Sequence, residues 1–407
     1  MHTLWWRIVS KKFHPSSYIA LLSLSYIALG VTIPAMSLIV VSKGFSLAQL
    51  SLAMIVFSLS VMAFEVPSGI FADAKGRRTS FSVGLFLSLV GSLLLFSPSF
   101  IVLCIGFACT GVGRAYTSGS MDALMIERGL KADRKLEDLV FALDINSGIS
   151  LSGGSLLGGL LLSMGSQQGN LTGLVLAVRF LLVASALVLL PLLIPKDSVV
   201  QGSSVTFGTQ AKQLGRTLSS SSFLLAFSIS VIVQGMLLAS LESYWQPYLK
   251  QLLESDSQLW ILGLISASIF AIGVLGSMIG KRFLSLMRPS VLYCLACISI
   301  FILQLFLSQS HTIAQFLVLY ELIYLLLGVV SVVGMYLLNK EASDMVRTSL
   351  ASVSSFCLQS GGLLGNLLAT VVFLFGGISS YWAIASVLGF LSMAVLSFWL
   401  LQRTPRT

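Results

Sequence analysis

The chain has 407 residues, of which 56% are hydrophobic and only 10% are charged. A soluble domain carries roughly a quarter charged residues, so the composition excludes a soluble enzyme. A helix that crosses the ~30 Å hydrocarbon layer needs about 20 apolar residues, and such runs occupy nearly all of this chain. The sequence therefore predicts an all-α polytopic membrane protein.

Residues 1–17 hold an apolar core that is too short for a cleavable signal peptide. Trp5 and Trp6 stand beside Arg7, a pattern typical of an amphipathic segment in the membrane interface. We expect these residues to lie on the cytoplasmic side.

Twelve apolar runs predict twelve membrane spans in two halves, 18–194 and 223–401, separated by a cytoplasmic loop over 195–222 and followed by a cytoplasmic tail over 402–407. The loop is rich in Ser, Gly and Gln. The predicted spans are 18–41, 49–71, 79–97, 100–126, 139–162, 171–194, 223–249, 260–280, 290–308, 313–338, 349–375 and 380–401.

The basic residues predict the orientation. Of the 24 lysines and arginines, 20 fall in segments that share a side with the N-terminus, Lys43 and Lys250 fall on the other side, and Arg114 and Arg179 fall within spans. Cytoplasmic loops carry the excess of Lys and Arg, which predicts that both termini are cytoplasmic. The net charge of +9 follows from this bias and does not indicate nucleic-acid binding.

The connection between the second and third spans reads EVPSGIFADAKGRRTS. Gly69, Asp73, Gly76, Arg77 and Arg78 fill, in register, a pattern of glycine, acid, glycine and cations. This stretch resembles the signature loop of the major facilitator superfamily of secondary transporters. The resemblance implies two related six-helix halves that bind a solute between them near the membrane midplane.

The resemblance also implies a cytoplasmic latch. Asp73 would meet the N-terminal end of the eleventh span near Ser349, and an arginine would pair with Glu127, or with Asp122 as second choice. An acid is stabilised at a helix N-terminus, and an arginine–carboxylate pair is directional. The alternative is that these charges only set the topology.

The halves repeat one another. The loop pattern recurs 204 residues later as Gly273, Gly280, Lys281 and Arg282, with Ser277 in place of the acid. SGGSLLGG in the fifth span is echoed by SGGLLG in the eleventh, and such glycine runs allow helices to approach closely. The run in the fifth span resembles a motif of the superfamily's antiporters, with Ser155 where that motif has proline.

Charged residues within spans are costly and indicate function or pairing. Arg114 lies near the middle of the fourth span, where it resembles an antiporter motif, although Gly119 follows it by five positions instead of four. We expect it to bind an anionic group, or alternatively to form a structural ion pair with Glu65 or Asp122.

Glu65 lies eight residues before Asp73, hence ~12 Å deeper in a regular helix. The Glu–x–Pro pattern that it forms with Pro67 resembles one branch of the superfamily. A desolvated carboxyl at this depth is suited to taking up and releasing a proton. The alternative is a fixed partner of an arginine or of backbone groups freed by Pro67.

By resemblance, the first, fourth, seventh and tenth spans line the cavity. Glu321, Tyr324 and Gly328 share one face of the tenth span, and Gln234 and Tyr26 could share the cavity with them. Glu321 could be a proton site or the counter-ion of a cationic substrate. Alternatively it is an interfacial acid.

The remaining charges have weaker predictions. Asp144 and Asn146 are expected to pair structurally, and the sequence indicates no role for Arg179. In ESYWQPYL, Glu242 could belong to an outer gate, its Tyr–Trp neighbours predict an interfacial belt, and Pro247 predicts a helix stop or kink.

The five cysteines fall in apolar runs and read as packing residues, and the three histidines suggest no metal site. No nucleotide-binding loop is present in the sequence. We therefore expect no enzyme activity, no cofactor beyond a proton gradient, and no nucleic-acid partner. The expected partners are the lipid bilayer, protons and a small molecule, with a monomer in the inner (plasma) membrane of a bacterium.

The sequence favours proton-coupled efflux of small amphipathic or drug-like compounds by alternating access. One alternative is a proton symporter that imports a small organic anion or nutrient. Another is a non-transporting receptor or assembly partner on the same scaffold, although a frozen scaffold has no need of a breakable latch.

Overall fold

A computed structural model describes residues 14–196, 222–341, 347–402 and none of the residues between or beyond them; no side chain is described for residues 341–352 or 402. The described residues are almost entirely helical and include no strand. The predicted amphipathic segment, apart from its last residues, and most of the loop over 195–222 lie outside the described residues.

The first half comprises nine helical elements. They are α2 (Pro15–Thr32), η1 (Ile33–Ala35), α3 (Leu38–Val41), α4 (Leu47–Lys75), α5 (Arg77–Leu94), α6 (Phe100–Thr117), α7 (Ser120–Lys131), α8 (Leu136–Gln167) and α9 (Gly173–Leu193).

The described residues of the second half form seven helical elements. They are α11 (Ser222–Leu252), η2 (Asp256–Leu259), α12 (Trp260–Phe283), α13 (Pro289–Leu307), α14 (Ile313–Glu341), α15 (Arg347–Val372) and α16 (Ile378–Gln402).

Helices stand at all twelve predicted spans. Eleven helical segments within the described residues are long and apolar enough to cross a membrane. The exception, α5, begins with Arg77 and Arg78, which lower its mean hydropathy. The all-helical polytopic fold is confirmed.

The helix contacts repeat between the halves. In the first half, α2 packs on α8 and α9, α6 packs on α4 and α5, and α5 packs on α9. In the second half, the corresponding spans make the same five pairs: α11 packs on α15 and α16, α14 packs on α12 and α13, and α13 packs on α16. The two bundles are joined by α8 with α12 and by α4 with α15.

Glycines make the repeated contact of α2 with α8 close. A Cβ placed on Gly30 would lie 2.5 Å from the carbonyl oxygen of Leu151 and 3.0 Å from Cα of Gly154. In the second half, Gly235 of α11 faces Gly361 of α15 in the same way. The two glycine runs noted in the sequence therefore bring these helices together, as small residues do in membrane helix pairs.

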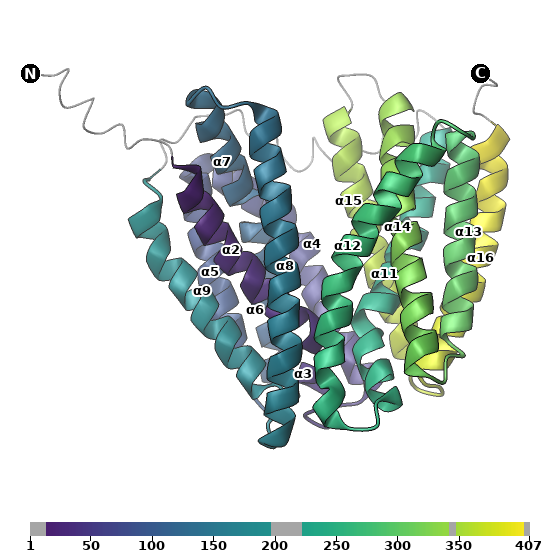
Figure 1. The fold of residues 1–407 in the computed structure, drawn as a ribbon, viewed down its shortest axis with the longest axis horizontal. Coiled ribbons are helices and arrows are strands. Elements are labelled where there is room, and N and C mark those ends of the chain that lie inside the picture. The colour runs from purple at the N-terminus through teal and green to yellow at the C-terminus, as the bar shows by residue number, and fades with distance from the viewer. Residues whose placement is uncertain (1–13, 197–221, 342–346, 403–407) are drawn as a thin grey trace, which may run out of the picture.

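The two bundles meet at one end and diverge toward the other (Figure 1). The start of α2 and the end of α16 lie at the diverging end, called here the terminus end; the other is the closed end. One apolar core continues from α3 and α4 into α11 and α14, whereas a separate core around Tyr18, Phe81 and Met121 belongs to the first half alone. The halves thus share a core only in part of their length.

Candidate functional site

The fourth span is broken. The α6 helix ends at Thr117 and α7 begins at Ser120, because Gly119 adopts a left-handed conformation with φ of 66° that glycine takes without strain. The sequence predicted one helix over 100–126, so the break is a correction. It places Arg114 in the last turn of α6 and Asp122 in the first turn of α7, where each charge is favoured by the helix dipole.

Asp122 is next to two other polar side chains. Tyr26 of α2 donates a hydrogen bond to Asp122 Oδ1 at 3.1 Å. Asp144 of α8 lies within electrostatic range of both. The structure thus brings together Tyr26 and Asp122, which the sequence singled out in different spans.

Arg114 is exposed within the bundle, and its guanidinium carbon lies 6.0 Å from the centre of the Phe57 ring. Among the described residues it forms no ion pair with Glu65 or Asp122, the two alternatives considered from the sequence. It lies within electrostatic range of Glu242 on α11. A cation of the first half and an acid of the second half therefore act on the same central region.

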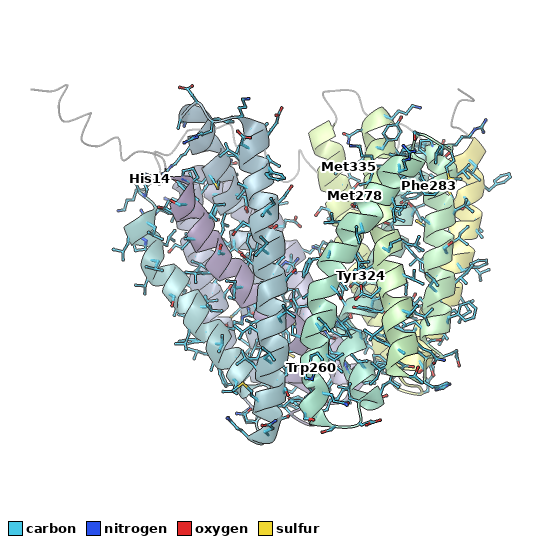
Figure 2. All side chains as sticks on the ribbon, in the orientation of Figure 1. His14, Trp260, Met278, Phe283, Tyr324 and Met335 are labelled. Carbon is cyan, nitrogen blue, oxygen red and sulfur yellow. The ribbon has the colours of Figure 1, made fainter. Side chains whose placement is uncertain are left out.

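Glu242 is exposed, and it also lies within electrostatic range of Tyr320 and Tyr324 on α14. Tyr324 stands at about mid-height of the bundle (Figure 2). Tyr244 and Trp245 do not form an interfacial belt: both are buried, and the Trp245 ring lies 5.4 Å from that of Tyr320. That prediction is wrong because these aromatic rings pack into the core of the second half.

Glu321 is directed toward α12. Ser268 of α12 donates a hydrogen bond to Glu321 Oε1, and Oε2 is buried without a hydrogen-bond partner among the described residues. On the same side of α14, the carbonyl of Gly328 accepts a hydrogen bond of 3.3 Å from Ser277 of α12. The face that carries Glu321 and Gly328 thus lies in a helix contact, where the sequence had placed it in the cavity.

Gln234 is half-buried and contacts a neighbouring helix. Its amide nitrogen donates to Tyr293 Oη of α13, so it ties two helices of the second half together and does not join Tyr26. Tyr293 itself is fully buried and satisfies both Gln234 and Ser230.

Glu65 lies on the seam between the halves. Its side chain is exposed, and its Oε1 accepts a hydrogen bond of 3.3 Å from Ser355 of α15. The expected desolvation of this carboxyl is therefore not found in the described state. Pro67 does not interrupt α4, which continues to Lys75.

The signature loop is a single residue between two helices. Gly76 joins α4 to α5 with φ of 95°, a conformation that L side chains rarely adopt. Arg77 Nε lies 3.9 Å from Glu127 Oε2 of α7, and Lys131 lies 2.7 Å from Glu127 Oε1. The predicted Arg77 and Glu127 pair is thus brought together, at the terminus end.

Asp73 is exposed on the last turns of α4 and pairs with no described residue. Its predicted neighbour Ser349 has a side chain outside the described residues. A Cβ on Gly69 would meet nothing within 4 Å. The neighbouring Arg78 also has an interaction partner.

The repeated loop in the second half is built differently. The α12 helix continues through Gly273 and Gly280 to Phe283, so Lys281 and Arg282 lie in its last turn. Gly280 is buried against Val329 of α14. The repeat therefore preserves cations at a helix end, where the dipole favours them, but not the one-residue connection.

A family model described as Major Facilitator Superfamily matches residues 19–349. The chain belongs to the Major Facilitator Superfamily. It is therefore a multi-pass membrane transporter and not an enzyme.

Known proteins resemble this superfamily member in part of its sequence or in its fold. An uncharacterized MFS-type transporter, YxaM of Bacillus subtilis (strain 168), is 29% identical over 100 residues, which span a quarter of either chain. The crystal structure of the nucleoside transporter NupG is 15% identical with a TM-score of 0.79, covering 95% of this chain and 98% of that one. A bacterial homolog of the human lysosomal transporter Spinster, inward-facing and occupied, has 13% identity and a TM-score of 0.69, with 96% of both chains covered.

Sequence reasoning missed a polar seam that joins the halves of the transporter at the closed end. Span one breaks at η1, beside Pro34, and the freed carbonyl of Ile33 accepts a hydrogen bond of 3.0 Å from Gln246 of α11. Ser37 donates to the carbonyl of Ser243 at 2.5 Å. Pro34 was the available signal for this break.

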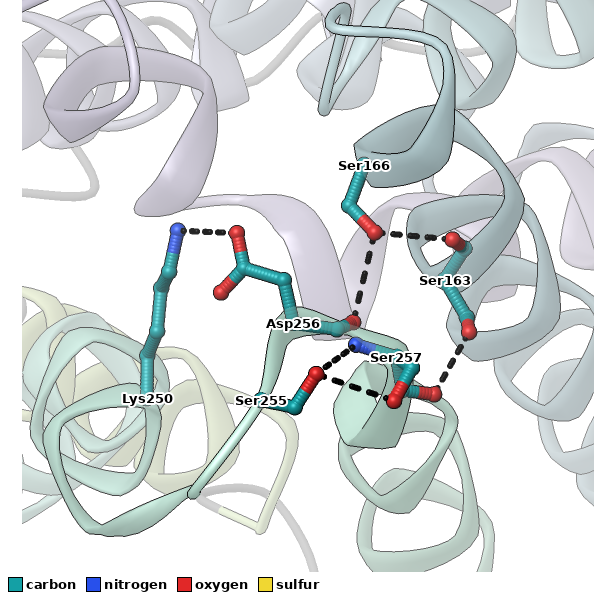
Figure 3. Close-up of polar contacts among 6 residues, drawn as sticks. All are labelled: Ser163, Ser166, Lys250, Ser255, Asp256 and Ser257. Atoms are coloured by element: carbon teal, nitrogen blue, oxygen red, sulfur yellow. Dashed lines mark hydrogen bonds and ion pairs between the residues drawn. The ribbon is translucent and has the colours of Figure 1, made fainter.

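A second part of the seam ties the end of α8 to η2 (Figure 3). Ser163 donates to the carbonyl of Ser257 at 2.7 Å, and Ser166 to that of Asp256 at 3.3 Å. Asp256 is fixed by Lys250 at 3.2 Å. These contacts hold the first and second halves together where the cores merge.

Arg179, which the sequence left unexplained, is 5% exposed on α9. Its Nη1 donates a long hydrogen bond of 3.5 Å to Thr32 Oγ1. Thr32 is the last residue of α2, so the buried cation lies by the negative end of that helix. Within the described residues, no group of three His, Cys, Asp or Glu side chains could hold a metal ion.

Proposed function

We propose that this transporter exports small amphipathic compounds in exchange for protons by alternating access. The observation that carries the proposal is the charge of its interior. Asp144 lies within electrostatic range of Asp122, and Glu242 of Arg114, so carboxyl groups outnumber the cation among these charged residues of the membrane-spanning helices. A negative interior attracts cationic solutes and protons.

Protonation would change which facing state is favoured, as any ligand does that binds two states unequally. Glu65 lies at the contact of α4 with α15, where its hydrogen bond to Ser355 joins the two halves. Glu321 offers a second proton site, because its Oε2 is buried without a described partner. No cofactor beyond the proton gradient enters this scheme, and a monomer suffices for it.

We place the terminus end in the cytoplasm of a bacterium, on the distribution of Lys and Arg. The described state then has its halves joined at the outer side and apart at the cytoplasmic side (Figure 1). In the opposite state, Asp73 would approach the start of α15 and close the cytoplasmic side. The Arg77–Glu127 contact lies within the first half, so it can persist in both states.

The second candidate is proton-coupled import of a small organic anion or nutrient. The exposed Arg114 favours it, because a guanidinium facing Glu242 across the central region could hold an anionic or polar solute. The fold that this chain shares with a nucleoside transporter is compatible with a nutrient.

The test is solute uptake by inverted membrane vesicles with an imposed inside-acid gradient, using lipophilic cations and neutral dyes. We expect uptake that is lost when the gradient is collapsed, and lost or strongly reduced in Arg114→Ala and Asp73→Asn. Asp138→Asn, an exposed acid at the same end of the molecule, is the matched control. Absence of uptake for every compound by well-folded protein would refute export, and nucleoside or organic-anion import would then be measured.

A further inference from the structure

The helices α8 and α12, one from each half, touch at the closed end and diverge toward the terminus end (Figure 1). A Cβ on Gly159 would lie 2.6 Å from Cα of Gly263. Nearer the terminus end, Ser152 donates a hydrogen bond of 3.4 Å to the carbonyl of Ala267. This is the last hydrogen bond described between the two helices in that direction.

The contact has an antiparallel register that extends past this hydrogen bond. Seven residues make about two helical turns, so a residue seven positions further along lies on the same face. Seven residues beyond the hydrogen-bonded pair stand Ile145 of α8 and Val274 of α12. Four residues beyond these, about one turn, stand Phe141 and Met278.

These four side chains are large, apolar and uncovered. Their exposed fractions are 66% for Phe141, 64% for Met278, 62% for Val274 and 44% for Ile145, whereas the glycines on the same two faces are buried. Met278 lies on the part of α12 nearer the terminus end (Figure 2). Each helix thus has one continuous face that is covered by the other half at the closed end and uncovered beyond it.

We propose that in the opposite facing state α8 and α12 close along this register, with Phe141 packing against Met278 and Ile145 against Val274. This inference rests on the alternating access proposed above. The four side chains, called here the α8–α12 gate, would then shut one side of the opening between the halves. Exposed apolar residues are common on membrane helices, but these four continue a face that is already an interface.

The chemistry of the gate suits a contact that is made and broken. The unbranched thioether of Met278 adapts its shape and packs favourably against an aromatic ring such as that of Phe141. Ile145 and Val274 are β-branched and therefore stiff. None of the four side chains carries a hydrogen-bonding group, so their separation leaves no polar atom unpaired.

The sizes of the side chains also fit a rocking motion. The glycine contact at Gly159 lets the two backbones touch at the closed end. Phe141 stands 18 residues away, ~27 Å along α8, so a small rotation about the glycines moves it through a much larger distance. Bulky side chains there can meet across a gap that small residues would leave open.

The first experiment maps the gate by photo-crosslinking in the full-length protein in lipid vesicles. The photoreactive residue benzoylphenylalanine replaces Phe141, and crosslinked peptides are identified by mass spectrometry. We expect crosslinks to residues 274–278 of α12. Val140 is the matched control position, because it is exposed on the same turn but points about 100° around the helix; from there we expect no crosslink to these residues.

The second experiment measures energy transfer between dyes at Arg134 and Lys340, both exposed at the terminus end. Phe141→Ala should reduce the fraction of molecules with the short distance by about 2- to 12-fold, the range for one methionine–aromatic contact. Met278→Ala should do the same, and the double variant should lose little more than either, because both changes remove one shared contact. Ile279→Ala, exposed but turned about 100° from Met278, should behave as the wild type.

Crosslinks from position 141 to lipid alone, or to parts of the second half outside residues 274–278, would overturn the inference. Additive effects of the two alanine substitutions would also overturn it. If the dyes report two distances in the wild type while the crosslinks miss α12, alternating access stands and only this register is wrong. A single distance under all conditions would overturn alternating access together with the gate. Thermal unfolding shows that each variant is folded.

Discussion

Gly159→Ala is predicted to drive the two halves apart at the closed end. A Cβ on Gly159 of α8 would lie 2.6 Å from Cα and N of Gly263 and 2.8 Å from the carbonyl oxygen of Trp260. All three atoms are backbone of α12, which belongs to the other half. No rotamer change can relieve such contacts, so the helices must separate.

The size of the effect follows from this geometry. Carbon atoms pack favourably at about 3.5–4.0 Å, so α8 and α12 would have to part by about 1 Å. Overpacking of this kind costs about 1–3 kcal/mol. Because the strain exists only where the two halves touch, it would shift the balance toward the opposite facing state by about 5- to 150-fold.

The assay is fluorescence energy transfer across the terminus end, between dyes attached through non-natural amino acids at Arg134 and Lys340, both exposed. The distance should shorten in Gly159→Ala. Gly153→Ala, on the same helix with nothing within 4 Å of its Cβ, carries the same gain in helix propensity and should behave as wild type. Identical distance distributions in all three proteins would refute the reasoning, as would an equal shift in both variants.

Three further predictions use the same preparations. Asp73→Asn should move the dyes further apart, because it weakens only the terminus-closed state, by about 0.3–1 kcal/mol for an acid at a helix N-terminus; a shift toward the closed terminus end would contradict the latch. Gln246→Leu should lower the free energy of unfolding by about 1–3 kcal/mol, because it leaves buried partners such as the Ile33 carbonyl unpaired; thermal unfolding measures this. Gln251→Leu, at an exposed position of the same helix, should leave the free energy of unfolding unchanged. Arg179→Met should leave the melting temperature unchanged or raise it, because one 3.5 Å hydrogen bond does not offset the free-energy cost of removing the guanidinium from water. A clear fall in the melting temperature would show that the end of α2 depends on this charge.

Much of the fold could be predicted because long apolar runs have few alternatives. The helices stand at the twelve predicted spans, and the glycine runs around Gly154 and Gly361 lie in equivalent helix contacts of the two halves. The approach of Arg77 to Glu127 was predicted from the resemblance of one short loop to a family motif.

The remainder depends on which way a side chain points, and a single sequence of nearly uniform apolarity does not encode this. Glu321 and Gln234 are polar residues on expected cavity helices, yet both turn toward neighbouring helices. The break at Gly119 needs φ above zero, which glycine permits but does not require. The adjacent Tyr244 and Trp245 have the sequence pattern of interfacial residues, but in the fold their rings pack against Phe373 and Tyr320.

The seam at the closed end has a consequence for how the molecule responds to salt. Its described contacts are hydroxyl and amide groups bonded to carbonyls, such as Ser163 with Ser257 and Gln246 with Ile33, and no ion pair among the described residues crosses between the halves. Dissolved ions screen exposed charges but barely weaken neutral hydrogen bonds. Opening this seam should therefore proceed at nearly the same rate in dilute buffer and in concentrated brine, whereas closure at the opposite end, which brings two faces rich in Lys and Arg together, should become faster as salt screens their repulsion.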